Sequence, residues 1–247
     1  MTILVGTTSW TDKTLIDCGR FYPKGCSTPE ARLRHYASVF PMVEIDSSYY
    51  AIPAVPVSRN WAMRTPAEFI FNIKAFRTFT RHQTSPTVLA KDLQAALGGT
   101  GKKMLYYRDF PSEILDELWR WFLEAVSPLR ETGKLAAVHF QFAPWILRNR
   151  EGRAHVEECV ERMAGHHLSV EFRNTTWFAP GHVEDTLRFE SKLGVTHTVV
   201  DGPQGITPSS NSKTCCPTFR PWRRRSACCK SSSTTTRRIR DSETPWH

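Results

Sequence analysis

Residues 42–53 read MVEIDSSYYAIP, and they place two carboxylates in a segment that otherwise has the composition of a buried strand. Because side chains alternate between the two faces of a strand, Glu44 and Asp46 share one face, while Val43 and Ile45 share the other. An acidic side chain among apolar neighbours is costly unless it is paired. The stretch therefore predicts a strand with one apolar face and one face that carries charge.

Strands and helices are predicted to alternate along the rest of the chain. Six short apolar segments have the β-branched and aromatic content of strands: 3–9, 42–48, 69–75, 135–142, 167–173 and 196–201. Segments with apolar residues at helical spacing lie between them. This alternation is typical of a parallel sheet, and the first strand is expected to be buried on both sides. The pattern alone leaves a closed barrel and an open sheet as alternatives.

Three helix ends carry local signals. Thr28 is predicted as an N-cap, because it precedes Pro29, which is tolerated at the first helical position. Ser112 is predicted to cap a helix with a long apolar stripe. Gly194 is expected to end a helix that starts at Val183.

Several motifs occur in the order in which they occur in the YecE-like family of domains of unknown function, DUF72. They are GTTSW (6–10), FYPKG (21–25), VEIDSSYY (43–50), NIKAFRTFTRH (72–82), HFQFAPW (139–145), VEFRNTTWF (170–178) and VVDGPQG (199–205). The chain resembles that family over roughly residues 3–205. The resemblance implies an α/β fold of the TIM-type (β/α) barrel class, with about six of the eight strand–helix units present. The family has no assigned substrate, so the resemblance implies a fold and a site but no reaction.

The chain is predicted to consist of a barrel domain, 1–205, and a disordered basic tail, 206–247, rich in Ser, Arg and Cys. The tail has nine Lys or Arg residues against two acidic ones, a net of +7 out of the total of +9, which leaves +2 for the domain. We favour the hypothesis that the reading frame shifts after Gly205 and leaves a truncated barrel, whose first strand would lack a neighbour on one side. The alternative is a genuine tail that binds nucleic acid.

The sequence gives no support for a membrane segment or a cofactor. No run of about 18 apolar residues occurs, and the start of the chain lacks the layout of a signal peptide, so a cytoplasmic protein is expected. Neither G-x-G-x-x-G nor G-x-S-x-G nor H-E-x-x-H is present. We therefore predict no cofactor and no metal, and a nucleic-acid partner only if the tail is genuine.

Polar residues near the carboxyl ends of the strands form the candidate site, because that is where barrel active sites lie. The candidate catalytic residues are Glu44, Glu171, Lys74 and Asp201. The candidate substrate-binding residues are Arg173, Gln141, Asp46, Trp10, Arg77, His82 and Trp177. Acids beside cations suit acid–base chemistry on an anion, either a small molecule or one derived from nucleic acid. The alternatives are a site that binds without chemistry, an ion-pair network with only a structural role, and a non-functional truncated product.

Overall fold

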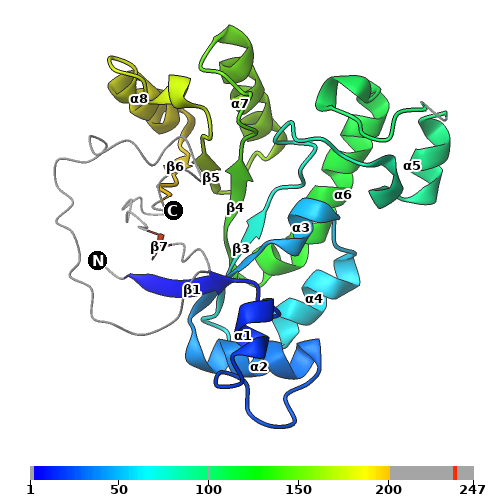
Figure 1. Ribbon diagram of the computed structural model, residues 1–247, viewed down its shortest axis with the longest axis vertical. Helices are drawn as coiled ribbons and strands as arrows, with labels where there is room; N and C mark the ends of the chain where they lie inside the picture. The colour runs from blue at the N-terminus through cyan, green and yellow to red at the C-terminus, as the bar shows by residue number, and fades with distance from the viewer. Residues whose placement is uncertain (1–2, 99–100, 201–235, 238–247) are drawn as a thin grey trace.

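The computed structural model describes residues 3–98, 101–200 and the backbone of 236–237. Strands in this part of the chain form one sheet, in the order β6-β5-β4-β3-β2-β1-β7 (Figure 1). They are β1 Leu4–Thr8, β2 Met42–Ile45, β3 Ile70–Lys74, β4 Leu135–Gln141, β5 Leu168–Glu171, β6 Thr196–His197 and β7 Thr236–Arg237. Strands β1 to β6 are parallel and each pairs with the next along the chain, so they make a curled half-barrel.

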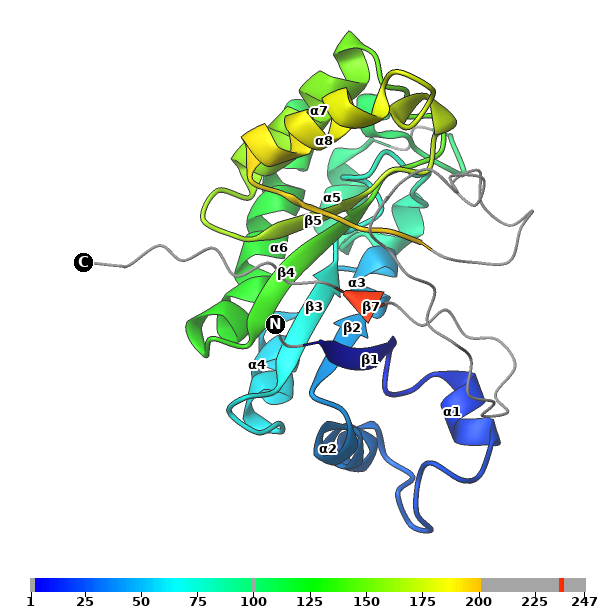
Figure 2. The same cartoon turned by 90° about the vertical axis from the view of Figure 1, so that its left-hand side faces the viewer.

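Helices cover one side of this sheet. The α-helices are α1 Lys13–Asp17, α2 Pro29–Val39, α3 Ser47–Tyr50, α4 Val55–Met63, α5 Lys91–Ala96, α6 Ser112–Glu131, α7 Arg150–Arg162 and α8 Val183–Leu193. Short 3-10 turns occur at η1 Pro86–Val88, η2 Tyr107–Asp109 and η3 Thr175–Trp177. Figures 1 and 2 show α2, α4, α6, α7 and α8 around the outside of the curl. The alternation confirms an α/β fold consistent with part of a TIM-type barrel. No helix in the described residues is long and apolar enough to cross a membrane.

The predicted helix ends are confirmed at two positions and wrong at the third. The Thr28 hydroxyl accepts a hydrogen bond from the Ala31 N–H at 3.1 Å. Gly194 has a φ of 67° and follows the last residue of α8. Ser112 is the first residue of α6 rather than its cap, because Pro111 occupies the N-cap position and has no N–H to lose.

All six predicted strands are shorter than expected, and the largest differences are at β2, β5 and β6. Strand β2 stops at Ile45, because the Ser48 hydroxyl donates to the carbonyl oxygens of Ile45 (2.9 Å) and Lys74 (2.6 Å) and so holds the next residues in the turn of α3. Strand β6 ends at His197. The expected extension to Asp201 reaches a residue that lies outside the described part of the chain.

Strand β1 differs from the prediction in its exposure and in its neighbours. Val5 is 45% exposed, so the strand is not buried on both sides. It also has a second neighbour, because β7 pairs antiparallel with Leu4 and Val5. On the β2 side, Gly6 allows a close approach: a Cβ at this position would lie 2.2 Å from the Met42 carbonyl oxygen.

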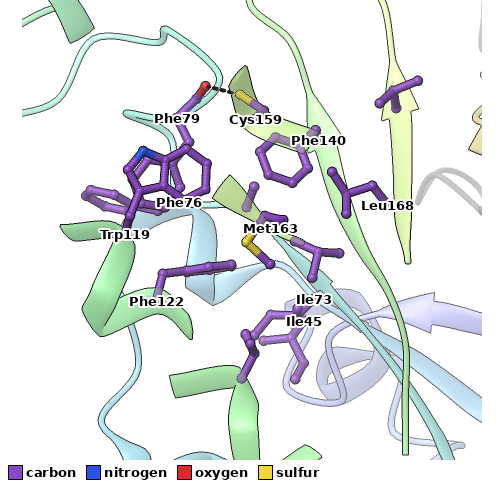
Figure 3. Close-up of a cluster of buried hydrophobic side chains, with 14 of the residues drawn as sticks. Ile45, Ile73, Phe76, Phe79, Trp119, Phe122, Phe140, Cys159, Met163 and Leu168 are labelled. Carbon is purple, nitrogen blue, oxygen red and sulfur yellow. Dashed lines mark hydrogen bonds between the residues drawn. The ribbon is translucent and has the colours of Figure 1, made fainter. Parts of the chain in front are cut away.

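The core lies between the sheet and the helices. Alternate apolar residues of β2 to β5 point into it, and α6 and α7 supply the opposite wall (Figure 3). The Phe79 and Trp119 rings stack with their centroids 3.6 Å apart. The Cys159 thiol donates to the Phe79 carbonyl oxygen at 3.6 Å. This packing leaves the other face of the same strands free for polar residues.

Candidate functional site

Polar residues occupy the face of the sheet opposite the helices. The pairing register places Glu44 beside Asn72, and Lys74 beside His139, one step nearer the carboxyl ends. Gln141 lies beside Glu171 in the last row. The strand register therefore brings these polar side chains together near the carboxyl ends of β2 to β5, where the sequence predicted them to lie.

Glu171 is the most heavily paired acid on this face. Its carboxylate is hydrogen-bonded to His139 Nε2 at 3.3 Å and accepts a hydrogen bond from Gln141 Nε2 at 3.1 Å. It also forms an ion pair with the Arg173 guanidinium. His139 Nδ1 in turn lies 3.0 Å from the Ser169 hydroxyl. Burial raises the pKa of Glu171, but His139, Arg173 and Gln141 outweigh it and hold the pKa below its ordinary value. The side chain is thus a fixed anion that anchors Arg173.

A second group of charges surrounds Tyr49 in α3. Lys74 Nζ lies 2.8 Å from the Asp46 carboxylate and 5.2 Å from the centre of the Tyr49 ring. The Arg77 guanidinium lies 5.2 Å from the same ring centre, and the Arg77 N–H donates to the Tyr49 carbonyl oxygen at 3.1 Å. Two cations therefore flank one aromatic ring at the carboxyl end of β3.

Arg77 differs from the other cations of the site. Lys74 and Arg173 each have a carboxylate partner, whereas no ion pair of Arg77 occurs within the described residues. Its Nε atom is buried and makes no hydrogen bond there. A half-buried guanidinium without an ion pair among the described residues is suited to bind an anion.

The pKa of His82 is lowered by burial and by nearby positive charge. Its Nδ1 lies 2.9 Å from the Thr80 hydroxyl. Burial and then the charges of Arg77, Lys74 and Arg173 lower its pKa to about 4, against a smaller opposing effect of Glu171. At neutral pH the imidazole is therefore uncharged.

Glu44 is buried and has no comparable set of partners. It is 8% exposed, and its carboxylate makes neither a hydrogen bond nor an ion pair within residues 3–98 and 101–200. Only its backbone is engaged, where the carbonyl oxygen accepts from the Ser9 N–H at 2.9 Å. Of the two acids that the sequence placed on β2 and β5, Glu44 is therefore the one without a side-chain partner among the described residues.

Two of the candidate residues are not brought to this group. Trp10 is buried in the core, with its ring 5.7 Å from that of Trp61. Trp177 is fully buried, stacks on Phe172 at 3.7 Å and donates its indole N–H to the Ile146 carbonyl oxygen at 2.8 Å. Neither tryptophan covers the polar face as expected. Asp201 lies outside the described residues.

Sequence reasoning missed residues that the structure adds to the site. His139 was not among the candidate residues, although it alternates with Gln141 along β4 and so lies on the polar face. Tyr49 and Trp145 lie within motifs that the sequence contains, but their ring contacts depend on how three loops meet. Among the described residues, no group of three or more His, Cys, Asp or Glu side chains is placed to hold a metal ion.

Comparisons with known proteins agree on one family. The family described as "Protein of unknown function DUF72" matches residues 4–243, a range that extends beyond Gly205. UPF0759 protein YunF of Bacillus subtilis (strain 168) is 32% identical over 202 residues, which are 82% of this chain and 61% of the relative.

Solved structures show the same relationship. A DUF72 family protein of Enterococcus faecalis V583 has a TM-score of 0.62 and 26% identity, covering 82% of this chain and 62% of the other. One from Thermotoga maritima MSB8 has a TM-score of 0.58 and 26% identity, covering 83% of this chain and 66% of the other. The chain thus spans roughly three fifths to two thirds of the length of these relatives. Given the extent of the family match, this chain belongs to the DUF72 family of proteins of unknown function.

Proposed function

We propose that the carboxyl ends of β2 to β5 bind an anionic substrate and carry out acid–base chemistry on it. The observation that supports this most directly is the half-buried Arg77 guanidinium beside Lys74, which has no ion pair within the described residues. A cation without a counter-ion in a half-buried position binds an anion more strongly than an exposed one does. The substrate is a small molecule or a fragment of nucleic acid.

In this proposal each charged residue has a separate role. Arg77 receives the anion, with Lys74 and Arg173 beside it. Glu171 is a positioning residue, because its lowered pKa makes it a weak base and its oxygens are already engaged. Glu44 transfers the proton, since its carboxylate has no partner among the described residues. Asp46 and Gln141 orient Lys74 and Glu171.

A site that binds an anion without chemistry is the second candidate. It is favoured by the pairing of Glu171, which leaves one unpaired acid rather than two for proton transfer. Binding of nucleic acid at such a site would weaken steeply with salt, because each phosphate contact releases counterions.

Turnover of an anion panel separates the two candidates. The full chain is incubated in D2O with phosphorylated and carboxylated compounds, and NMR records binding, product formation and deuterium incorporation. We expect Glu44→Gln to slow turnover by about 10²-fold or more while binding persists. The control Glu151→Gln alters an acid that is exposed and paired with Arg81. Binding without turnover in the unaltered chain would favour the second candidate, and no binding at all would refute both.

The tail 206–247 carries a separate hypothesis, a change of reading frame after Gly205 that would leave a non-functional truncated product. Sequencing the gene across codons 200–247 and translating all three frames tests it. A second frame that continues as a strand and helix would support the hypothesis. An uninterrupted frame without such a continuation would make the net charge of +7 a property of the protein and bring nucleic-acid binding forward.

A further inference from the structure

Five rings form a continuous line along the edge of the proposed site. Tyr50 contacts Tyr49 with ring centres 5.0 Å apart, and Tyr49 contacts His82 at 5.4 Å. His82 then contacts Trp145 at 5.8 Å, and Trp145 contacts Tyr106 at 6.1 Å. We call these five residues the aromatic arc. It joins loops that follow three different strands, so no single sequence motif contains it.

The arc offers exposed ring faces next to cations. Tyr50 is 55% exposed and Trp145 is 49% exposed, so both side chains are accessible to a ligand. The Trp145 indole N–H donates to the Arg81 carbonyl oxygen at 3.1 Å, so the ring is held in place although it is exposed. The Arg108 guanidinium lies 5.9 Å from the centre of the Tyr106 ring, and Lys74 and Arg77 flank Tyr49.

We propose that the aromatic arc binds a nucleobase whose phosphate is held at Arg77, so that the anion recognised by this site is a nucleotide unit. This inference rests on the proposed function, because it assigns a substrate class to the same anion site. Aromatic platforms interleaved with cations are how proteins hold unpaired nucleotides, since every base has a face that stacks and every phosphate has a charge. The net charge of residues 1–205 is only +2, which favours a ligand of one or a few nucleotides over nonspecific binding of a long nucleic acid.

The chemistry of the arc distinguishes this ligand from other anions. A sugar phosphate or a carboxylate would use Arg77 and Lys74 but would leave the exposed Trp145 ring without a partner. A nucleotide uses both, because it is planar at one end and charged at the other. The affinity for a nucleotide should therefore depend on Trp145, and the affinity for phosphate should not.

Calorimetric titration of the full chain tests the inference with matched probes: adenosine 5′-monophosphate, ribose 5-phosphate and a tetranucleotide of deoxyadenosine. We expect adenosine 5′-monophosphate to bind about ten-fold more tightly than ribose 5-phosphate, because stacking of one base contributes about that much affinity. Trp145→Leu should remove that difference and leave ribose 5-phosphate binding unchanged, while Trp145→Phe retains most of it. Arg77→Met should weaken both probes, because both carry the phosphate.

The outcomes are distinct. Equal binding of the two monophosphates, or an equal loss of both in Trp145→Leu, would overturn the nucleobase assignment and leave the anion site standing. Failure of every phosphate probe to bind would refute the anion site itself. Tighter binding of the tetranucleotide than of the mononucleotide, with a steep dependence on salt, would identify the ligand as single-stranded nucleic acid. Equal affinities would identify a free nucleotide.

Discussion

Two cations at opposite ends of the sheet show how differently the same kind of charge is treated. At the amino end of β4, Lys134 is 6% exposed and donates to the carbonyl oxygens of Ala62 (2.6 Å) and Thr65 (2.7 Å). It thereby satisfies backbone groups at the end of α4. At the carboxyl end of β3, Arg77 has a buried Nε without a hydrogen bond and no ion pair within the described residues. The first cation is committed to the fold, and the second is available to a ligand.

The difference between Lys134 and Arg77 matches the different roles of the two strand ends in α/β barrels. Residues at the amino ends of the strands contribute stability, and those at the carboxyl ends carry function. A buried charge with all its donors used stabilises the folded state, whereas one with a donor left over costs free energy until something binds. We therefore expect Lys134→Met to lower stability and Arg77→Met to weaken ligand binding.

The largest effect on stability is expected for Lys134→Met. The variant keeps the apolar stem but leaves the carbonyl oxygens of Ala62 and Thr65 without their donor, so the free energy of unfolding should fall by about 3 kcal/mol. Denaturant titration measures it. A loss below about 0.5 kcal/mol would mean that water replaces the lysine without cost, and would remove the contrast with Arg77.

Glu171→Gln should cost less, about 2 kcal/mol at pH 7, because the amide still fits but no longer offsets Arg173. The pKa of Glu171 is lower in the folded state than its ordinary value of 4.5. The stabilisation by the carboxylate is therefore present above pH 4.5 and is lost as the pH falls through the folded-state pKa. The difference between variant and parent should shrink from pH 6 to pH 3. A constant difference would show that the charge of Glu171 is not what stabilises the fold.

The smallest expected effect is the uptake of a fraction of one proton by the protein when an anion binds. A bound anion offsets Arg77, Lys74 and Arg173, so the pKa of His82 should rise from about 4 towards its ordinary value of 6.5. Proton uptake should be measurable at pH 5.5 and absent at pH 8. Calorimetry of phosphate binding in two buffers of different ionisation enthalpy records it, with His82→Asn as the control. Equal uptake in that variant would assign the proton to another group.

Strand and helix positions followed from the sequence because a buried face imposes a period that the residues display. Val43 and Ile45 pack as expected, and Glu44 faces the other way. The exposure of β1 was predicted less well. Val5 is exposed because of what lies beside β1 in the sheet, and the composition of β1 itself does not show this.

The site was predictable only where one strand sets the geometry. Alternation placed Gln141 and Glu171 on the polar face, and register brought them together. Trp10 and Trp177 were expected at the site, but loop side chains follow the available space, and both fill the core. The aromatic arc could not be predicted, because Tyr49, His82 and Trp145 meet only after three loops are in place.

The most direct test of the account compares phosphate affinity in two arginine variants of the full chain at one ionic strength. Arg77→Met removes the half-buried guanidinium that has no ion pair in the described part of the chain, and Arg150→Met removes an exposed one at the start of α7. We expect at least a ten-fold loss of affinity for Arg77→Met, no change of affinity for Arg150→Met, and a stability change below about 0.5 kcal/mol in both. Equal affinity losses in both variants, or none in Arg77→Met, would contradict this expectation.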